Sequence, residues 1–117
     1  MKMDKKPLDE LLADLKIGLS SIYGERLKGL YLYGSFARGE ADEESDLDIL
    51  VVLEQFESYG REVDRTGELG SGLSLKYGVT ISQVFMRQAE WLKGETPFLS
   101  NVREEAVIPA LDVETIY

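Results

Sequence analysis

The sequence predicts a protein of the α/β (α+β) class, in which helices and short strands alternate along the chain. Two observations support this class: apolar residues change between helical and strand-like spacing, and residues 47–53 form a nearly continuous apolar run of β-formers. Such a run is typical of a central strand covered on both faces. The length of 117 residues suits one hydrophobic core, so we expect residues 1–117 to form a single domain.

The first predicted element is an amphipathic helix over residues 8–22. Pro7 suits its first turn, and Gly24 lies just past its end. Apolar side chains recur at helical spacing along it, at Leu8, Leu11, Leu12, Leu15, Leu19 and Ile22. Residues 28–33 then alternate and end at Gly34, which predicts a first strand, and residues 35–39 predict a short helix.

The second half of the chain predicts a crossover and two short helices. Phe56, Tyr59 and Val63 have helical spacing, so we expect a helix from Phe56 to Leu75 despite its glycines, with Gly78 as its stop. The third strand is predicted from Val79 to Phe85. The remaining predictions are a short helix around Trp91, an N-cap and first turn at Thr96–Pro97, a helix from Phe98 to Glu105, and an edge strand at Val107–Ile108.

Composition excludes several kinds of chemistry. The chain has no histidine and no cysteine, so it cannot assemble a histidine-based nucleophile, a zinc–histidine site or a disulfide. The net charge of −9 argues against broad contact with nucleic acid. No apolar run approaches the roughly 20 residues of a membrane-spanning helix, and the N-terminus lacks the apolar core of a signal peptide. We therefore expect a cytoplasmic protein without membrane association.

One segment carries most of the chemical information. Gly34-Ser35 follows the first strand directly, and Asp46 and Asp48 open the second. Strand side chains repeat their direction every second residue, so the two carboxylates are expected on one face, roughly 6–7 Å apart. Backbone amides at a Gly–Ser turn can hold phosphate oxygens, and paired carboxylates suit Mg²⁺. These residues predict a site for a magnesium-bound nucleotide.

Each of these residues also has a structural interpretation. Gly34-Ser35 alone could be a turn with a helix cap, and Asp46 and Asp48 alone could be a solvated strand end. Asp42–Glu44 could be a solvated acidic loop, and Arg38 could form a surface ion pair with Glu40 or Asp42. Tyr31 and Tyr33 are expected to face the core or a helix.

The sequence does not match other ligand-binding motifs. A calcium loop begun at Asp42 would put leucines at its glycine and closing glutamate positions, and no Gly-Lys-Ser/Thr phosphate loop is present. The glycines of residues 67–72 resemble a dinucleotide-binding fingerprint only if the spacing of that fingerprint is reversed.

The pattern Gly-Ser-x-Ala-Arg-Gly, an acidic loop and Ser-Asp-x-Asp before an apolar strand resembles the minimal nucleotidyltransferases of the DNA polymerase β-like superfamily. The resemblance implies a small mixed β-sheet with helices packed on it, and transfer of a nucleoside monophosphate from a triphosphate. By position, Asp46 and Asp48 would be catalytic and hold two Mg²⁺ ions. The nucleotide, ATP by preference, would contact Gly34, Ser35, Arg38 and Ser45.

The chain departs from the family at one position. Active relatives carry a third carboxylate on the next strand, where this chain has no acid between Glu68 and Glu90. Ser82 is the expected occupant of that position, and its neutral hydroxyl is a poorer ligand and no base at neutral pH. A remote acid, Asp64 or Glu90, is the alternative.

The resemblance leaves three functions open. The first is adenylylation of a protein, as the antitoxin of a HEPN toxin pair. The second is a weakened nucleotide-binding module that acts by binding and occluding a partner protein, which the absent third acid favours. The third is a transferase for a small molecule, for which residues 86–117 leave little room.

Overall fold

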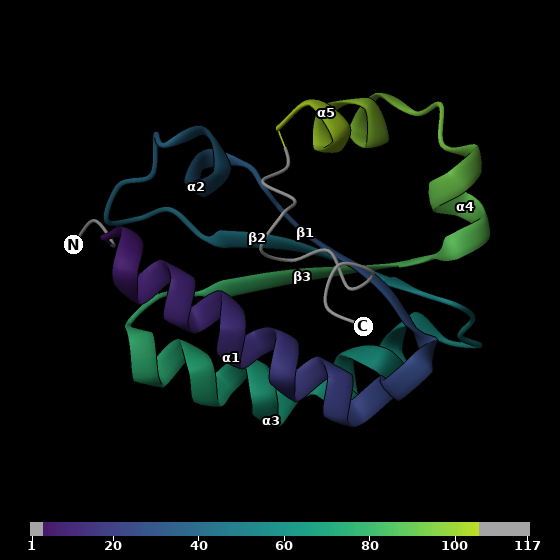
Figure 1. The fold of residues 1–117 in the computed structure, drawn as a ribbon, viewed down its shortest axis with the longest axis horizontal. Coiled ribbons are helices and arrows are strands. Elements are labelled where there is room, and N and C mark those ends of the chain that lie inside the picture. Colours follow the sequence, from purple (N-terminus) through teal and green to yellow (C-terminus); the bar gives the residue numbers. More distant parts are fainter. Residues whose placement is uncertain (1–3, 106–117) are drawn as a thin grey trace.

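A three-stranded sheet lies between two layers of helices in the computed structural model, which describes residues 4–105 (Figure 1). The strands are β1 (Leu27–Tyr33), β2 (Leu47–Leu53) and β3 (Ile81–Arg87), in the order β1-β2-β3. β2 is antiparallel to β1 and parallel to β3. The mixed sheet and the central position of β2 confirm the predictions made from the sequence.

Two long helices cover one face of the sheet. They are α1 (Lys5–Tyr23), with Gly24 just past its end as predicted, and α3 (Tyr59–Tyr77), which connects β2 to β3. The two helices run side by side below the sheet in Figure 1. Their apolar side chains pack with one face of β2 in a buried cluster that includes Leu11, Leu15, Leu19, Leu73, Leu47, Ile49, Val51 and Leu53. Apolar burial on this face is the main stabilising contribution to the fold.

Short helices cover the other face. They are α4 (Gln88–Lys93) and α5 (Pro97–Glu105), both predicted, and Thr96 caps α5 by accepting from the Leu99 amide at 3.3 Å. Trp91 stacks on Tyr31 with ring centroids 4.6 Å apart, and Phe98 meets Tyr33 edge-on at 5.5 Å. Both tyrosines therefore face helices, as predicted. Leu50, Val52 and Val102 are buried between these layers, so β2 is covered on both faces.

Two short helical segments complete the described chain. The 3₁₀ helix η1 (Gly24–Arg26) leads from α1 into β1, and α2 (Ser35–Arg38) follows β1 as predicted. The predicted edge strand at residues 107–108 lies outside the described residues. Among the described residues, no helix has the length and apolar character needed to cross a membrane.

The predicted bounds of α3 and β3 were partly wrong. Phe56 precedes α3, and Tyr59 and Val63 are each 46% exposed, whereas Glu62 and Thr66 are buried. The apolar spacing therefore identified a helix but assigned part of it to the wrong face. β3 begins two residues later than predicted because the amides of Gly78 and Val79 both bond to the Ser74 carbonyl and close the helix.

Candidate active site

The Gly34 backbone lies against the carboxylate of Asp48. Gly34 ends β1 and caps α2 with a φ of 78° and a ψ of −159°, a region almost exclusive to glycine. A Cβ at this position would overlap Oδ2 of Asp48 and lie 3.2 Å from its Cγ. Two separate features therefore favour glycine at position 34: its backbone conformation and its contact with the carboxylate of Asp48. The predicted turn and the predicted aspartate meet in space.

The two aspartates differ in their surroundings. Asp48 is the second residue of β2 and half-buried, beside Tyr33 on one side and Ser82 on the other. Asp46 precedes the strand and is exposed, and the next amide, of Leu47, donates to the Thr80 carbonyl at 2.8 Å. The segment offers one carboxylate held in the sheet and another open to solvent.

The acidic loop before Asp46 is ordered by its own hydrogen bonds. The Ser45 hydroxyl donates to Oδ1 of Asp42 at 3.1 Å and accepts from the Asp42 amide at 2.9 Å, while the Glu44 amide bonds to the same Oδ1. Such side-chain-to-backbone bonds are typical of turns. Ser45 thus shapes the approach to Asp46, and contact between its hydroxyl and a nucleotide stays a prediction.

Ser35 and Arg38 lie on α2. Ser35 is the half-buried first residue of the helix, and the Arg38 amide donates to the Gly34 carbonyl at 3.1 Å. The Arg38 side chain forms an ion pair with Glu40, with 3.3 Å between Nε and Oε2, and both groups are exposed. The structural interpretation of Arg38 is confirmed for Glu40. A phosphate contact of the same guanidinium stays a prediction.

Ser82 occupies the position beside Asp48 on the neighbouring strand. The parallel register pairs these two residues directly. Within residues 4–105, no three acidic, histidine or cysteine side chains gather closely enough to hold a metal ion. Neither Asp64, exposed on α3, nor Glu90, paired with Arg87 at 3.0 Å, joins the aspartates in such a group.

The donor set fits a hard divalent cation that shares its coordination with a substrate. Mg²⁺ characteristically binds one or two protein carboxylates together with substrate phosphates and water. Asp46 and Asp48 would supply the carboxylates, and the close approach of Gly34 leaves backbone rather than a side chain beside Asp48. Ser82 adds a neutral oxygen at the same level of the sheet.

A hollow of about 720 Å³ opens beside Asp46. Its wall includes Phe36 from α2, Thr80 before β3, and Lys76 and Tyr77 from the last turn of α3. Leu75-Lys76-Tyr77-Gly78 also belongs to the pattern that resembles the minimal nucleotidyltransferases, but the sequence did not predict Lys76 and Tyr77 as site residues. Their place at the hollow depends on how α3 packs, which the sequence pattern alone does not show.

Lys76 and Tyr77 both bond to Asp14 of α1. The Tyr77 hydroxyl donates to Oδ2 of Asp14 at 2.6 Å, and Nζ of Lys76 lies 3.0 Å from the same oxygen. The Tyr77 hydrogen bond, followed by Lys76, lowers the pKa of Asp14. The same contacts raise the pKa of Lys76 and Tyr77. These bonds fasten the end of α3 to α1 at the edge of the hollow.

A small mixed sheet with a Gly–Ser turn against an aspartate-bearing central strand defines a nucleotidyltransferase domain. The chain belongs to the nucleotidyltransferase domain family, whose model matches residues 12–109. The candidate protein adenylyltransferase MJ0141 of Methanocaldococcus jannaschii is 31% identical over 98 residues, which cover 84% of this chain and 94% of that protein. The protein is thus a nucleotidyltransferase, as the sequence predicts.

Solved structures share the fold. A candidate minimal nucleotidyltransferase superposes with a TM-score of 0.61 and 27% identity, covering 90% of this chain and 95% of that one. A chain from a toxin–antitoxin crystal structure with AMP-PNP has a TM-score of 0.55 at 22% identity, covering 81% of this chain and 70% of that one. The second likeness concerns the fold alone.

Proposed function

We propose that this nucleotidyltransferase is Mg²⁺-dependent and transfers AMP from ATP to a protein, as the antitoxin partner of a HEPN protein. The contact between Gly34 and Asp48, two residues after Asp46, supports the proposal. It puts a glycine turn, of a kind that can bind phosphate, next to carboxylates, which are ligands that suit Mg²⁺. The name of MJ0141 as a candidate protein adenylyltransferase supports a protein acceptor. The AMP-PNP in the related toxin–antitoxin structure supports an adenine nucleotide and a protein partner.

The proposed roles follow from the positions of the residues. The Gly34–Ser35 turn holds phosphate oxygens, and Arg38 offsets their charge. Asp46 and Asp48 hold two Mg²⁺ ions, which supply charge neutralisation for the triphosphate and the leaving pyrophosphate. An acceptor oxygen forms a bond to the α-phosphorus, the bond from that phosphorus to the bridging oxygen breaks, and pyrophosphate leaves with the electron pair.

A base other than Ser82 must accept the proton of the acceptor hydroxyl. A neutral hydroxyl cannot take that proton near neutral pH, whereas a carboxylate can. We therefore propose slow transfer, with water or a group of the partner as the base. The same observation favours a second candidate function, in which the domain binds nucleotide and acts by occluding its partner.

Calorimetry tests nucleotide and metal binding directly. ATP is expected to bind with Mg²⁺ and not in EDTA, and Asp46→Asn or Asp48→Asn is expected to abolish that binding. Asp64→Asn removes an exposed acid from α3 and serves as the matched control. Equal binding in EDTA, or full binding by both site variants, would rule the proposal out.

Labelled ATP separates the two candidate functions. Incubation of the protein with labelled ATP, Mg²⁺ and a HEPN partner is expected to label the partner. Co-expression of the two proteins is expected to relieve the toxicity of the partner. The Asp46→Asn/Asp48→Asn variant should form the complex without labelling. Relief of toxicity by that variant would establish occlusion instead.

A further inference from the structure

A second hollow lies at the end of the sheet opposite Asp48. Its volume is about 460 Å³, within the range of small-molecule sites. The register places the Leu27–Leu53 pair at this end and the Tyr33–Asp48 pair at the other. Leu27 and Tyr33 are six positions apart along β1, which corresponds to roughly 20 Å. The hollow is therefore separate from the proposed nucleotide site.

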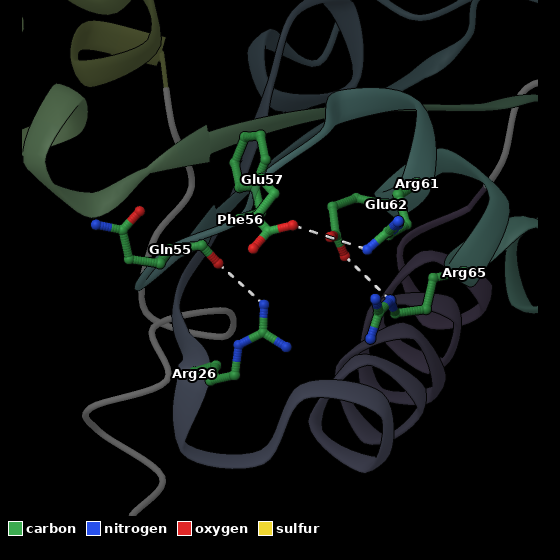
Figure 2. Close-up of a pocket in the computed structure, with 7 residues that line it drawn as sticks. All are labelled: Arg26, Gln55, Phe56, Glu57, Arg61, Glu62 and Arg65. Atoms are coloured by element: carbon green, nitrogen blue, oxygen red, sulfur yellow. Dashed lines mark hydrogen bonds and ion pairs between the residues drawn. The ribbon is translucent and has the colours of Figure 1, made fainter.

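Three arginines line this hollow. Arg26 comes from η1, and Arg61 and Arg65 come from successive turns of α3, where residues four apart share a face. Figure 2 shows the three guanidinium groups around one open space, with Glu57 and Glu62 beside them. The arrangement gathers cations in a chain whose net charge is −9.

The polar contacts of the three arginines within residues 4–105 use few of their guanidinium donors. A terminal nitrogen of Arg26 donates to the Gln55 carbonyl at 2.9 Å. Arg61 lies 3.8 Å from Glu57, whose side chain is 90% exposed, so this pair contributes little. Arg65 approaches Glu62 through Nε at 3.3 Å, which leaves its two terminal nitrogens for another ligand.

A buried framework holds one of these guanidiniums in place. Glu62 is 2% exposed, and its Oε1 accepts from the Tyr23 hydroxyl at 2.7 Å as well as facing Arg65. Within residues 4–105 this carboxylate is paired with Arg65, whereas Arg61 is paired with Glu57 and Arg26 donates to a backbone carbonyl. The hollow opens at the first turns of the 19-residue helix α3, whose N-terminal amides add positive potential.

We propose that this hollow is a second ligand site, which binds the phosphate group of a small molecule between Arg26, Arg61 and Arg65. Arginine forks match phosphate oxygens through paired hydrogen bonds. A phosphate dianion offers enough oxygens to engage three guanidiniums at once, whereas a carboxylate offers two. The hollow has room for a phosphate ester larger than inorganic phosphate itself.

Nuclear magnetic resonance titration in EDTA tests this site without metal-dependent nucleotide binding. Inorganic phosphate and AMP are the two probes, and shifts are expected at the amides of residues 57–62 and at the Nε–H groups of the arginines. Arg26→Gln/Arg61→Gln should weaken binding by about tenfold or more. Lys93→Gln, which removes an exposed cation from α4, should leave it unchanged.

The outcomes decide the proposal. Tighter binding of AMP than of phosphate would identify an ester ligand, and equal binding would identify the phosphate group alone as the recognised feature. Arg61→Lys keeps the positive charge but loses the paired N–H donors of the guanidinium. This variant should therefore bind the probes more weakly than the wild type and more tightly than Arg61→Gln. Absence of shifts at 50 mM of either probe, or equal weakening by Lys93→Gln, would overturn the proposal. Persistence of binding in Asp46→Asn/Asp48→Asn would show that it does not depend on the nucleotide site.

Discussion

The carboxylate of Asp48 lies so close to Gly34 that no side chain fits between them. The two residues are fourteen positions apart in sequence and become neighbours because β1 and β2 pair antiparallel, with Tyr33 opposite Asp48. Gly34, the residue after Tyr33, therefore lies against the carboxylate of Asp48. This relationship joins the turn and the strand that we propose to bind phosphate and metal into one site.

Gly34→Ala should destabilise the fold and displace Asp48. Its positive φ alone costs about 1–3 kcal/mol for a residue with a Cβ, and the added methyl overlaps the Asp48 carboxylate. Gly24→Ala is the control, because Gly24 has a φ of 56° and a ψ of −130° with nothing within 4 Å of an added Cβ. Urea unfolding should show losses in both variants, while only Gly34→Ala loses ATP binding. Normal ATP binding by Gly34→Ala would refute the site geometry.

Ser82→Asp should restore a three-carboxylate site. Without metal the new acid faces Asp48 directly and lowers stability by up to about 1 kcal/mol through like-charge repulsion. With Mg²⁺ the loss should reverse, because the cation binds only the folded state. Thermal unfolding with and without Mg²⁺ measures this, and Ser71→Asp on an exposed position of α3 is the control. An equal Mg²⁺ effect on both variants would contradict the assignment of Ser82.

Tyr77→Phe should raise the pKa of Asp14, which the Tyr77 hydrogen bond lowers most. A lowered folded pKa gives stability that is present above the unfolded value of about 3.9 and is lost as pH falls through the folded value. The variant should therefore be less stable than the wild type at pH 7, and the difference should shrink in acid. Titration of the Asp14 carboxyl by NMR provides the direct measurement. Identical titration curves would disprove the coupling.

Tyr23→Phe should cost about 1–3 kcal/mol, because it removes a hydrogen bond to the buried carboxylate of Glu62. Combined with Glu62→Gln, the loss should be less than additive, which a double-mutant cycle in urea can measure. Tyr59→Phe removes a partly exposed hydroxyl that accepts from the Phe85 amide, so it should cost less. Strict additivity of the Tyr23 and Glu62 variants would show that the bond contributes nothing.

Much of the fold was predictable because its signals are local. Apolar spacing, Gly24 and Gly78 as helix stops, and the Thr96–Pro97 cap depend on residues within a turn or two of one another. The face of α3 was not predictable in the same way. Glu62 and Thr66 are buried there because Tyr23 from α1 and the helix's own carbonyls satisfy them, and such partners are visible only after folding.

The sequence by itself determined the residues of the candidate site, since the Gly–Ser turn, the aspartate pair and the missing third acid are all properties of the chain. Tertiary structure decided which of them meet. The antiparallel β1–β2 register brings Gly34 against Asp48, and the parallel β2–β3 register brings Ser82 beside it. The arginine-lined hollow was likewise not predictable from the sequence, because its cations come from segments about 35 positions apart, which the packing of α3 beside α1 brings together.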